Sequence, residues 1–434
     1  MMKKSRKFLN RRQKYERSEK RQAQVDLSDT GIAFRDTGIS IFWLDNWGWT
    51  SSGYARNVLE ECVQTMEKYH PLCKKQLPEK TKDIYTEVVK KYENRWFVSR
   101  YELFLDLERT TRSLGDGHTA VLPYGNLNRY FERTKNKKAE ELSFEYQEGK
   151  IYVSVEGQKY QLMKLNGYSQ EEILRHCIFY GEYENEYGVK KDISILNRLE
   201  GLVLYDLGKI TDTYIHIQYL SGSGKLISRT YPFYTSQKSK TPKWSYEIEE
   251  NYAILTINEC WNTPEFSEFL DEFFTKLSQT DIQNLAIDLR KNGGGNDICA
   301  AVISHLGVSE YVSSQGFPQK PDGQVEDATC KTLPSSDPFN GNVYVLTSKN
   351  TYSSATVLAV TLFINELGKI IGEPSSNSPS SYGDCTIETF ADGNFLMQVS
   401  QYYMYLPVQG DTMQVDIPCP PEQAVEVFQK EIGD

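Results

Sequence analysis

The sequence contains no long apolar run and no closely paired cysteines, and both absences exclude classes of protein. None of the apolar stretches among the 434 residues is long enough to span a bilayer, so no membrane-spanning segment is expected. The eight cysteines are scattered singly without a CxxC pair, which argues against a zinc site and favours mostly reduced thiols. Neither a metal nor an organic cofactor is expected.

Positive charge is scarce outside the N-terminus. The chain carries 49 Lys and Arg against 59 Asp and Glu, a formal net charge of -10, which argues against nucleic acid as a partner. The exception is residues 1–25, a basic arm that is expected to be solvated and disordered. This arm lacks the apolar segment of a signal peptide. A cytoplasmic protein is therefore expected, or an exported one if the true start differs.

Apolar periodicity divides the rest of the chain into three parts. Residues 56–125 repeat apolar side chains at helical spacing and predict an N-terminal helical subdomain. Residues 145–235 alternate apolar and polar side chains and predict a β-rich domain. Residues 245–434 alternate strand and helix patterns, including a helix from Pro264 to Leu277, which predicts a layered α/β domain.

The stretch from residue 343 to 383 predicts a strand, a tight turn, a helix and a second strand. Ser353 and Ser354 fall in the turn where the helix begins. A serine at this place can cap the helix, or it can present its hydroxyl to a substrate beside free backbone N–H groups. From this stretch alone, both uses remain open.

A second stretch, residues 285–299, predicts a buried strand followed by three adjacent glycines, Gly293, Gly294 and Gly295. Glycines after a strand allow positive φ and a close approach of the backbone to a ligand. They can also form a plain turn. A phosphate-binding loop is disfavoured, because the Lys-Ser/Thr ending and the GxGxxG spacing are both absent.

Together the two stretches resemble the S41 peptidases, which include tail-specific and C-terminal-processing proteases and the tricorn-type core. The family's Asp-x-Arg-x-Asn-x-Gly-Gly loop is matched by Asp288, Arg290, Asn292, Gly294 and Gly295. Its Thr-x-Ser-Ala-Ala-Glu turn is matched by Thr351, Ser353 and Ala355, with Ser354 and Thr356 departing from the pattern, and Gly372 and Glu373 follow. By this resemblance Ser353 is the nucleophile of a serine peptidase that acts on peptides or unfolded proteins.

The resemblance also implies a crotonase-like (ClpP/crotonase-type) layered α/β catalytic domain over residues 245–434. The β-rich domain resembles a PDZ domain around the Asn166-Gly167 turn, which precedes a short predicted helix. A β-rich insertion without a peptide groove is the alternative for this region.

One departure concerns the base. Processing proteases place a general-base lysine shortly after Gly-Glu-Pro, but here no lysine follows Pro374 until Lys430. The segment from 114 to 121 instead resembles the tricorn-like branch, in which a histidine at the place of His118 is the base. A histidine at a strand start is also often structural.

The resulting hypothesis is ordinary serine chemistry. Ser353 attacks a carbonyl, His118 takes and returns the proton, and the backbone N–H groups of Gly294 and Ser354 bind the oxyanion. Asp116, Glu373 and Asp384 are candidate partners of the histidine, and none of them is assigned.

Alternatives from other classes remain open at this point. A catalytically inactive S41-like peptide-binding protein would explain Thr356 and the missing lysine, and an esterase would use the same residues. Cys299 and Cys385 flank the site but are interpreted as buried, inert thiols. The other histidines considered, His70, His176 and His216, are interpreted as structural.

Overall fold

The computed structural model describes most of the chain from residue 48 onward. The described ranges are 48–123, 136–181, 183–207, 213–235, 241–320, 328–391 and 393–433, together with residues 128 and 132. The basic arm predicted for residues 1–25 lies outside them. Within the described ranges, no helix is both long and apolar enough to cross a membrane.

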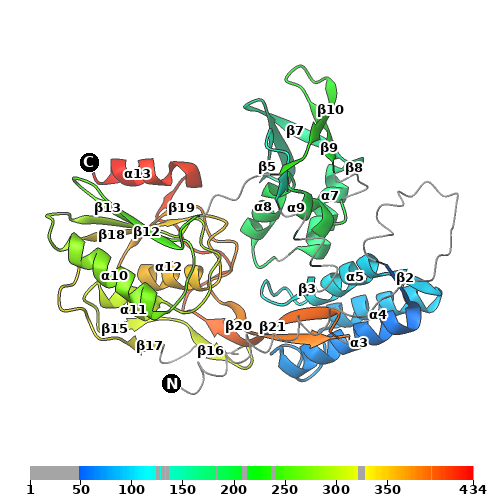
Figure 1. The fold of residues 1–434 in the computed structure, drawn as a ribbon, viewed down its shortest axis with the longest axis horizontal. Helices are drawn as coiled ribbons and strands as arrows, with labels where there is room; N and C mark the ends of the chain where they lie inside the picture. Colours follow the sequence, from blue (N-terminus) through cyan, green and yellow to red (C-terminus); the bar gives the residue numbers. More distant parts are fainter. Residues whose placement is uncertain are drawn as a thin grey trace. The chain divides into compact units, whose positions relative to one another are not determined.

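Three helices follow one another at the start of the described chain (Figure 1). They are α3 (Ser52–Tyr69), α4 (Glu79–Glu93) and α5 (Arg100–Arg112), accompanied by the antiparallel strands β1 (Trp49–Ser51) and β2 (Phe97–Ser99). The side chains of Ser51 and Ser99 accept backbone N–H bonds in the first turns of α3 and α5 and so cap them. The apolar faces of the three helices pack into one core.

A hairpin from far along the chain completes this helical core. Its strands are β20 (Ser381–Phe390) and β21 (Phe395–Tyr405), and β3 (Ala120–Pro123) and β16 (Gln315–Phe317) pair with β21. Phe390, Phe395, Met397 and Val399 of the hairpin are buried with the side chains of α3, α4 and α5. The helices therefore depend on residues near the other end of the chain for their packing.

The middle of the chain forms an antiparallel sheet of order β10-β9-β7-β6-β5 with β8 beside β7. Its members are β5 (Leu142–Gln147), β6 (Lys150–Val155), β7 (Gln158–Leu165), β8 (Tyr168–Ser169), β9 (Tyr214–Leu220) and β10 (Leu226–Pro232), with helices α7 (Gln170–Tyr180), α8 (Glu186–Ser194) and α9 (Leu199–Leu204). Asn166 and Gly167 make the turn between β7 and β8 with φ of 48° and 91°. The likeness to a PDZ domain stays a prediction.

The C-terminal part is built on a six-stranded sheet of order β12-β13-β14-β18-β19-β22. The strands are β12 (Trp244–Ile248), β13 (Ala253–Ile257), β14 (Asn284–Asp288), β18 (Asn342–Thr347), β19 (Lys369–Gly372) and β22 (Ile417–Pro418). β12 is antiparallel to β13 and the other pairs are parallel. Because parallel strands end at the same edge, the loops after β14 and β18 meet there.

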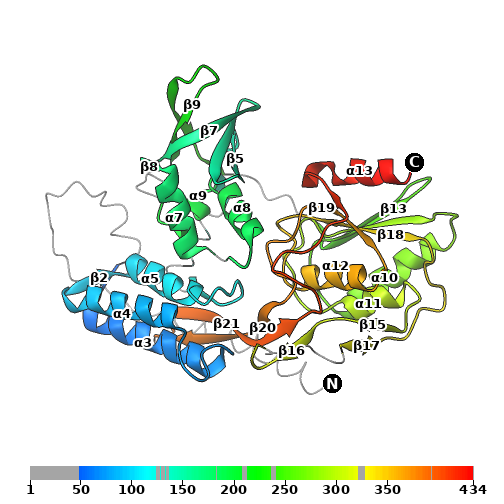
Figure 2. The same cartoon turned by 180° about the vertical axis from the view of Figure 1, so that it is seen from behind.

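Helices cover both faces of this sheet (Figure 2). On one face lie α10 (Pro264–Leu277), α11 (Cys299–Ser304) and α12 (Ser354–Ile364), and on the other η1 (Pro421–Gln423) and α13 (Ala424–Glu431). Alternate residues of each strand are buried on opposite faces: Leu285 and Ile287 pack with α10 to α12, and Ala286 packs with α13. The α/β prediction is confirmed, and the crotonase-like detail stays a prediction.

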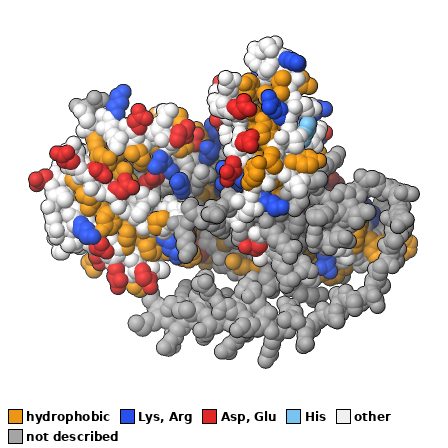
Figure 3. All heavy atoms as spheres, turned by 45° about the horizontal axis from the view of Figure 1, so that its top comes forward, with side chains coloured by type: hydrophobic (Ala, Val, Ile, Leu, Met, Phe, Trp, Pro, Cys, Tyr) orange, Lys and Arg blue, Asp and Glu red, His pale blue; other side chains and the backbone are white. Residues whose placement is uncertain are grey.

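Two small sheets complete the described elements. They pair β4 (Lys137–Lys138) with β11 (Tyr234–Thr235), and β15 (Glu310–Val312) with β17 (Thr329–Lys331). Acidic and basic side chains are interspersed over the described residues on the face shown in Figure 3. The expectation that nucleic acid is not a partner stays a prediction.

Candidate active site

The two loops singled out in the sequence are hydrogen-bonded to each other. In the loop after β18, the Ser348 hydroxyl donates to the Arg290 carbonyl (2.6 Å) and the Thr351 hydroxyl donates to the Leu289 carbonyl (2.9 Å). The Tyr352 N–H donates to the Asn292 carbonyl at 2.9 Å. These bonds fix the start of α12 against the glycine loop.

Ser353 occupies the turn between that loop and α12 in a strained conformation. Its φ and ψ are 55° and -127°, outside the regions that a residue with a side chain ordinarily adopts. The Ser353 hydroxyl makes no helix-capping hydrogen bond, and its N–H donates to Asn377 Oδ1 at 2.8 Å. Ser353 therefore does not cap α12 through its side chain. Strain at a serine on a strand-to-helix turn is typical of nucleophiles.

Gly294 forms the wall opposite Ser353. Its φ is 97°, and a Cβ placed on it would lie 2.6 Å from Ser353 Cβ and 3.2 Å from Ser353 Oγ. Only glycine fits this approach. The Gly294 N–H donates to Asn292 Oδ1 at 2.8 Å. As an oxyanion donor, it would have to exchange this acceptor for the oxyanion.

We expect Gly294→Ala to abolish reaction of Ser353 with an active-site probe. The added methyl would force Ser353 aside, and its own positive φ would cost about 1 to 3 kcal/mol. Gly293→Ala is the matched control, because a Cβ there meets nothing within 4 Å. Labelling by a fluorophosphonate should persist in the control only; equal labelling of both variants would contradict the close approach.

His118 lies beside the nucleophile turn. It follows the Asp116-Gly117 turn and leads into β3, and its carbonyl accepts from Gln398 Nε2 at 2.9 Å. Its ring stacks on the Tyr352 ring with centroids 4.9 Å apart and planes tilted by 30°. The residue is 8% exposed. The structure thus brings His118 against the residue that precedes Ser353, more than two hundred positions away in sequence.

Asp116 is a buried carboxylate that organises the His118 turn. Its Oδ1 accepts the His118 N–H (2.8 Å), and its Oδ2 lies 3.0 Å from His70 Nε2 and accepts from the hydroxyls of Thr119 and Ser400. Burial alone would raise the pKa of Asp116. The hydrogen bond and charge of His70, with smaller contributions from His118 and Thr119, outweigh burial and lower this pKa below its usual range.

We expect Asp116→Asn to lower the free energy of unfolding by about 3 kcal/mol at pH 7, because the donors around it lose a charged acceptor. Because the pKa of Asp116 is lower in the folded protein than in the unfolded chain, its charge stabilises the fold fully at pH values above the pKa of an ordinary aspartate. This stabilisation is lost as the pH falls from that value toward the pKa in the folded protein. Urea unfolding at pH 7 and pH 3 should therefore show the difference from wild type shrinking at pH 3. The exposed Asp83, changed to Asn, is the control; a pH-independent difference would contradict the charge argument.

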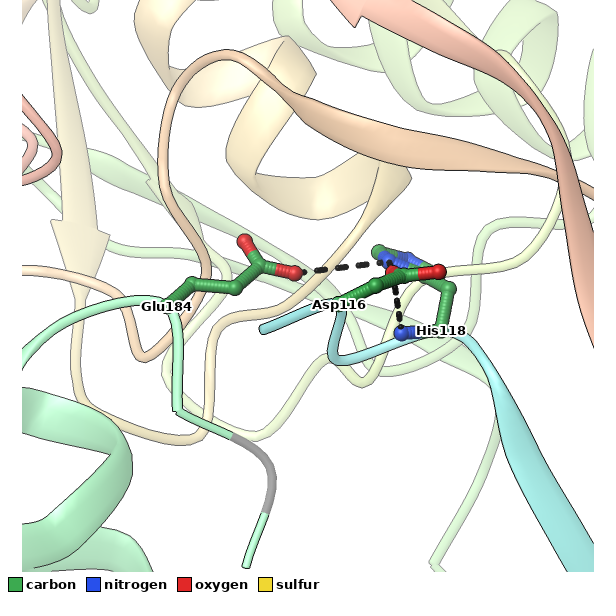
Figure 4. A group of neighbouring side chains, drawn as sticks. All are labelled: Asp116, His118 and Glu184. Atoms are coloured by element: carbon green, nitrogen blue, oxygen red, sulfur yellow. Dashed lines mark hydrogen bonds and ion pairs between the residues drawn. The ribbon is translucent and has the colours of Figure 1, made fainter. Parts of the chain in front are cut away.

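Glu184 joins this cluster from the segment between α7 and α8, and no motif in the sequence indicates its place here. Figure 4 shows its carboxylate directed toward the ring of His118, which the Asp116 side chain overlaps in this view. Glu184 Oε1 lies 3.7 Å from His118 Nδ1 and accepts the Gly117 N–H at 3.1 Å. A Cβ on Gly117 would lie 2.1 Å from the Tyr352 hydroxyl, so a larger residue there would push the Tyr352 side chain aside.

The donor atoms of Asp116, His118 and Glu184 all lie within 4.8 Å of one another. Among the described residues, these three are the group that could hold a metal ion. However, both carboxylates already accept hydrogen bonds from protein N–H groups, and Asp116 also accepts from two hydroxyls. This donor set suits a hydrogen-bonded acid-base cluster.

The other groups considered from the sequence lie elsewhere or are inert. Burial raises the pKa of the Cys299 thiol well above its usual value and that of Cys385 to about 12, so both stay protonated thiols. Lys349, which precedes the nucleophile turn in the sequence, pairs with Glu373 at 3.6 Å. Those two residues therefore neutralise each other.

A pocket of about 250 Å³ lies along α12 beyond the candidate site. Its lining is mainly apolar: Val360, Phe363, Pro379, Pro407, Val408 and Met413, with Gln409, Thr412 and Gln414. Pro379 is two residues from Asn377, which accepts the Ser353 N–H.

Comparison with known proteins agrees with the fold and with the two loops. Residues 251–417 match the model of peptidase family S41. Among curated proteins, none matches the sequence. The match contains Ser353 and the glycine loop, and the prediction of an S41-type serine peptidase is confirmed by it. His118 and Glu184 lie outside the matched residues.

Solved structures show the same fold over most of the chain. The photosystem II D1 C-terminal processing protease is 13% identical, with a TM-score of 0.50 over 88% of this chain and 97% of its own. Mature CPAF is 11% identical, with a TM-score of 0.63 over 88% of this chain and 96% of its own. Its complex with lactacystin gives a TM-score of 0.61 at 9% identity, over 88% and 97%. At such identities the likeness concerns the fold alone.

Proposed function

Because residues 251–417 match peptidase family S41, we propose that this serine peptidase works through an acyl-enzyme on Ser353, with His118 as its general base. The observation that carries the proposal is the conformation of Ser353. Ser353 has a φ of 55° on a strand-to-helix turn, and its hydroxyl makes no helix-capping hydrogen bond. The strained backbone is therefore not offset by a stabilising cap. The strain is explained if this turn holds the Ser353 hydroxyl where a substrate can reach it.

The steps follow from the placement of the groups. His118 in its neutral form takes the proton of the Ser353 hydroxyl while the oxygen attacks the substrate carbonyl. The proton then passes to the leaving amine, which departs and leaves an ester on Ser353. Water, deprotonated by the same imidazole, hydrolyses this ester and restores the serine.

The oxyanion would be bound by backbone N–H groups at the start of α12. The Ser354 N–H stands at the positive end of this helix, where an anion is favoured. The Gly294 N–H is the second donor once it exchanges Asn292 for the oxyanion. The Ser354 hydroxyl donates to the Gly295 carbonyl at 2.8 Å, which holds the two sides of the hole together.

The substrate would be a peptide or an unfolded protein chain, as the family match suggests. The mainly apolar pocket along α12, whose lining on that helix begins at Val360, supports a preference for an apolar side chain at a substrate position away from the cleaved bond. An inactive peptide-binding protein is the competing function. An esterase would use the same residues.

The test is labelling with a fluorophosphonate, with the attachment site read by peptide mass spectrometry, followed by hydrolysis of fluorescein-labelled casein. We expect label on Ser353 and cleavage of casein. Label on Ser353 without cleavage of casein, but with cleavage of a simple ester, would favour the esterase. A folded protein that neither labels nor cleaves would overturn the proposal and leave peptide binding to be measured.

A further inference from the structure

Glu184 is a buried carboxylate beside His118 that has no part in the mechanism proposed above. Its side chain is 5% exposed, in the segment that joins α7 to α8 of the middle sheet region. Oε1 accepts the Gly117 N–H at 3.1 Å and lies 3.7 Å from His118 Nδ1. A buried carboxylate is stable only with hydrogen-bond or charged partners, and those of Oε1 are on the turn that carries His118.

The other oxygen of Glu184 connects to the nucleophile. Oε2 accepts from Asn377 Nδ2 and from the Ser378 N–H (2.8 Å). Asn377 Oδ1 in turn accepts the Ser353 N–H at 2.8 Å. One chain of contacts therefore runs from the backbone of Ser353 through Asn377 and Glu184 to the ring of His118.

Asp116 is the competing carboxylate, since its Oδ1 lies 3.9 Å from His118 Nδ1. That oxygen accepts the His118 N–H within the turn, and Oδ2 is surrounded by His70, Thr119 and Ser400. Glu184 is the nearer of the two carboxylates. Closure by about 0.8 Å would make its contact with Nδ1 an ordinary hydrogen bond, as catalytic contacts do when substrate binds.

We propose that Glu184 is the positioning residue of this site: it accepts the Nδ1 proton of His118 in a hydrogen bond and leaves Nε2 to take the proton of Ser353. The inference rests on the proposed function and adds the carboxylate that the sequence left unassigned. A carboxylate on Nδ1 fixes the tautomer and orientation of the ring and stabilises the imidazolium that forms.

The segment that carries Glu184 is itself anchored in the α/β part. Asn185 Nδ2 donates to the carbonyls of Ser375 (3.1 Å) and Asp411 (3.0 Å). Lys191 of α8 places its Nζ 4.6 Å from the centre of the Tyr352 ring. The middle region therefore supplies the carboxylate that lies near His118, and it also contacts the residue before Ser353 and the loop after β19.

The first test is the titration of His118 by NMR, which does not require activity. Groups that face this ring are Asp116, Glu184 and Tyr352, with Lys191 on the Tyr352 ring. Cys385 contacts only the backbone of this residue, with its Sγ 3.7 Å from the His118 carbonyl. With only five histidines in the chain, loss of one signal in His118→Ala assigns it. Glu184→Gln should lower the apparent pKa of His118 by about one unit, since a nearby negative charge is lost.

The second test is kinetic. Glu184→Gln should lower kcat by about 10²-fold or more with little change in KM, and should move the acid limb of kcat/KM to lower pH. Glu184→Asp, which keeps the charge, should recover part of both effects. Glu186→Gln is the matched control, because Glu186 is an exposed neighbour paired with Lys190 at 3.3 Å.

The outcomes separate this inference from the proposed function. An unchanged His118 titration in folded Glu184→Gln overturns the inference even if the enzyme is active. A fall in kcat with an unmoved acid limb also overturns it, because a merely structural role would give that result. A wild-type protein that neither labels nor cleaves overturns the proposed function, while the titration still decides whether Glu184 faces His118.

Discussion

Replacing Ser353 with alanine should remove fluorophosphonate labelling completely and lower kcat on an unfolded protein substrate by about 10⁴- to 10⁶-fold. The reason is that the proposed acyl-enzyme forms on the Ser353 hydroxyl, which alanine lacks. The neighbouring Ser354 uses its hydroxyl to donate to the Gly295 carbonyl. Residual hydrolysis would come from oxyanion binding and substrate binding alone. Both readouts can be taken on the same protein preparation.

The same position allows a test of the strain. Alanine keeps the positive φ of Ser353, so Ser353→Ala should unfold at nearly the wild-type urea midpoint. Glycine tolerates this conformation, and Ser353→Gly should therefore be inactive but more stable by about 1 kcal/mol. Ser267→Ala, on the exposed face of α10, is the control for loss of a serine hydroxyl. Label that persists in Ser353→Ala would show that another residue is the nucleophile.

The sequence predicted those elements that carry their own local signals. The helix from Pro264 to Leu277 has these bounds in the structure, because Pro264 stands at its start and Thr263 accepts the Phe266 N–H. The Asn166-Gly167 turn follows from the ease with which both residues adopt positive φ. The two loops that frame Ser353 were recognised from short motifs, and parallel strands bring such loops to one edge.

The sequence could not predict contacts that exist only in three dimensions. Glu184 lies 193 residues from Asn377, and in a polar segment it resembles any solvated glutamate. Its role depends on burial, which no local pattern reveals. The same holds for the hairpin of β20 and β21, whose Phe390 and Phe395 are buried in a helical core formed by residues 55–121. Apolar alternation predicts a strand but not its partner.

The conformation of Ser353 could not be predicted from the sequence. It favours presentation of the Ser353 hydroxyl to a substrate over helix capping. A serine at a helix start is commonly a cap. Here the hydroxyl does not cap, the N–H is taken by Asn377, and Gly294 approaches from the other side. The backbone is held in place by neighbours on two other loops. This is how a protein maintains strain at a functional residue.

Replacing His118 with alanine should lower kcat/KM by at least 10²- to 10⁴-fold, which is the usual contribution of a general base. The acid limb of the pH profile, which reports protonation of the base, should disappear with it. The cavity left beside the Tyr352 ring should admit free imidazole, so added imidazole should restore part of the activity. The measurement is casein hydrolysis from pH 5 to pH 9, with and without imidazole.

His216→Ala is the control for loss of a histidine, since His216 lies on β9 and bonds to Thr230 and Ser228. The combined variant decides whether Ser353 and His118 act together. A nucleophile and its base are one unit, so the double variant should be no slower than Ser353→Ala alone. Effects that instead multiply would mean that His118 supports the site through folding or substrate binding, and another base would have to be sought around Ser353.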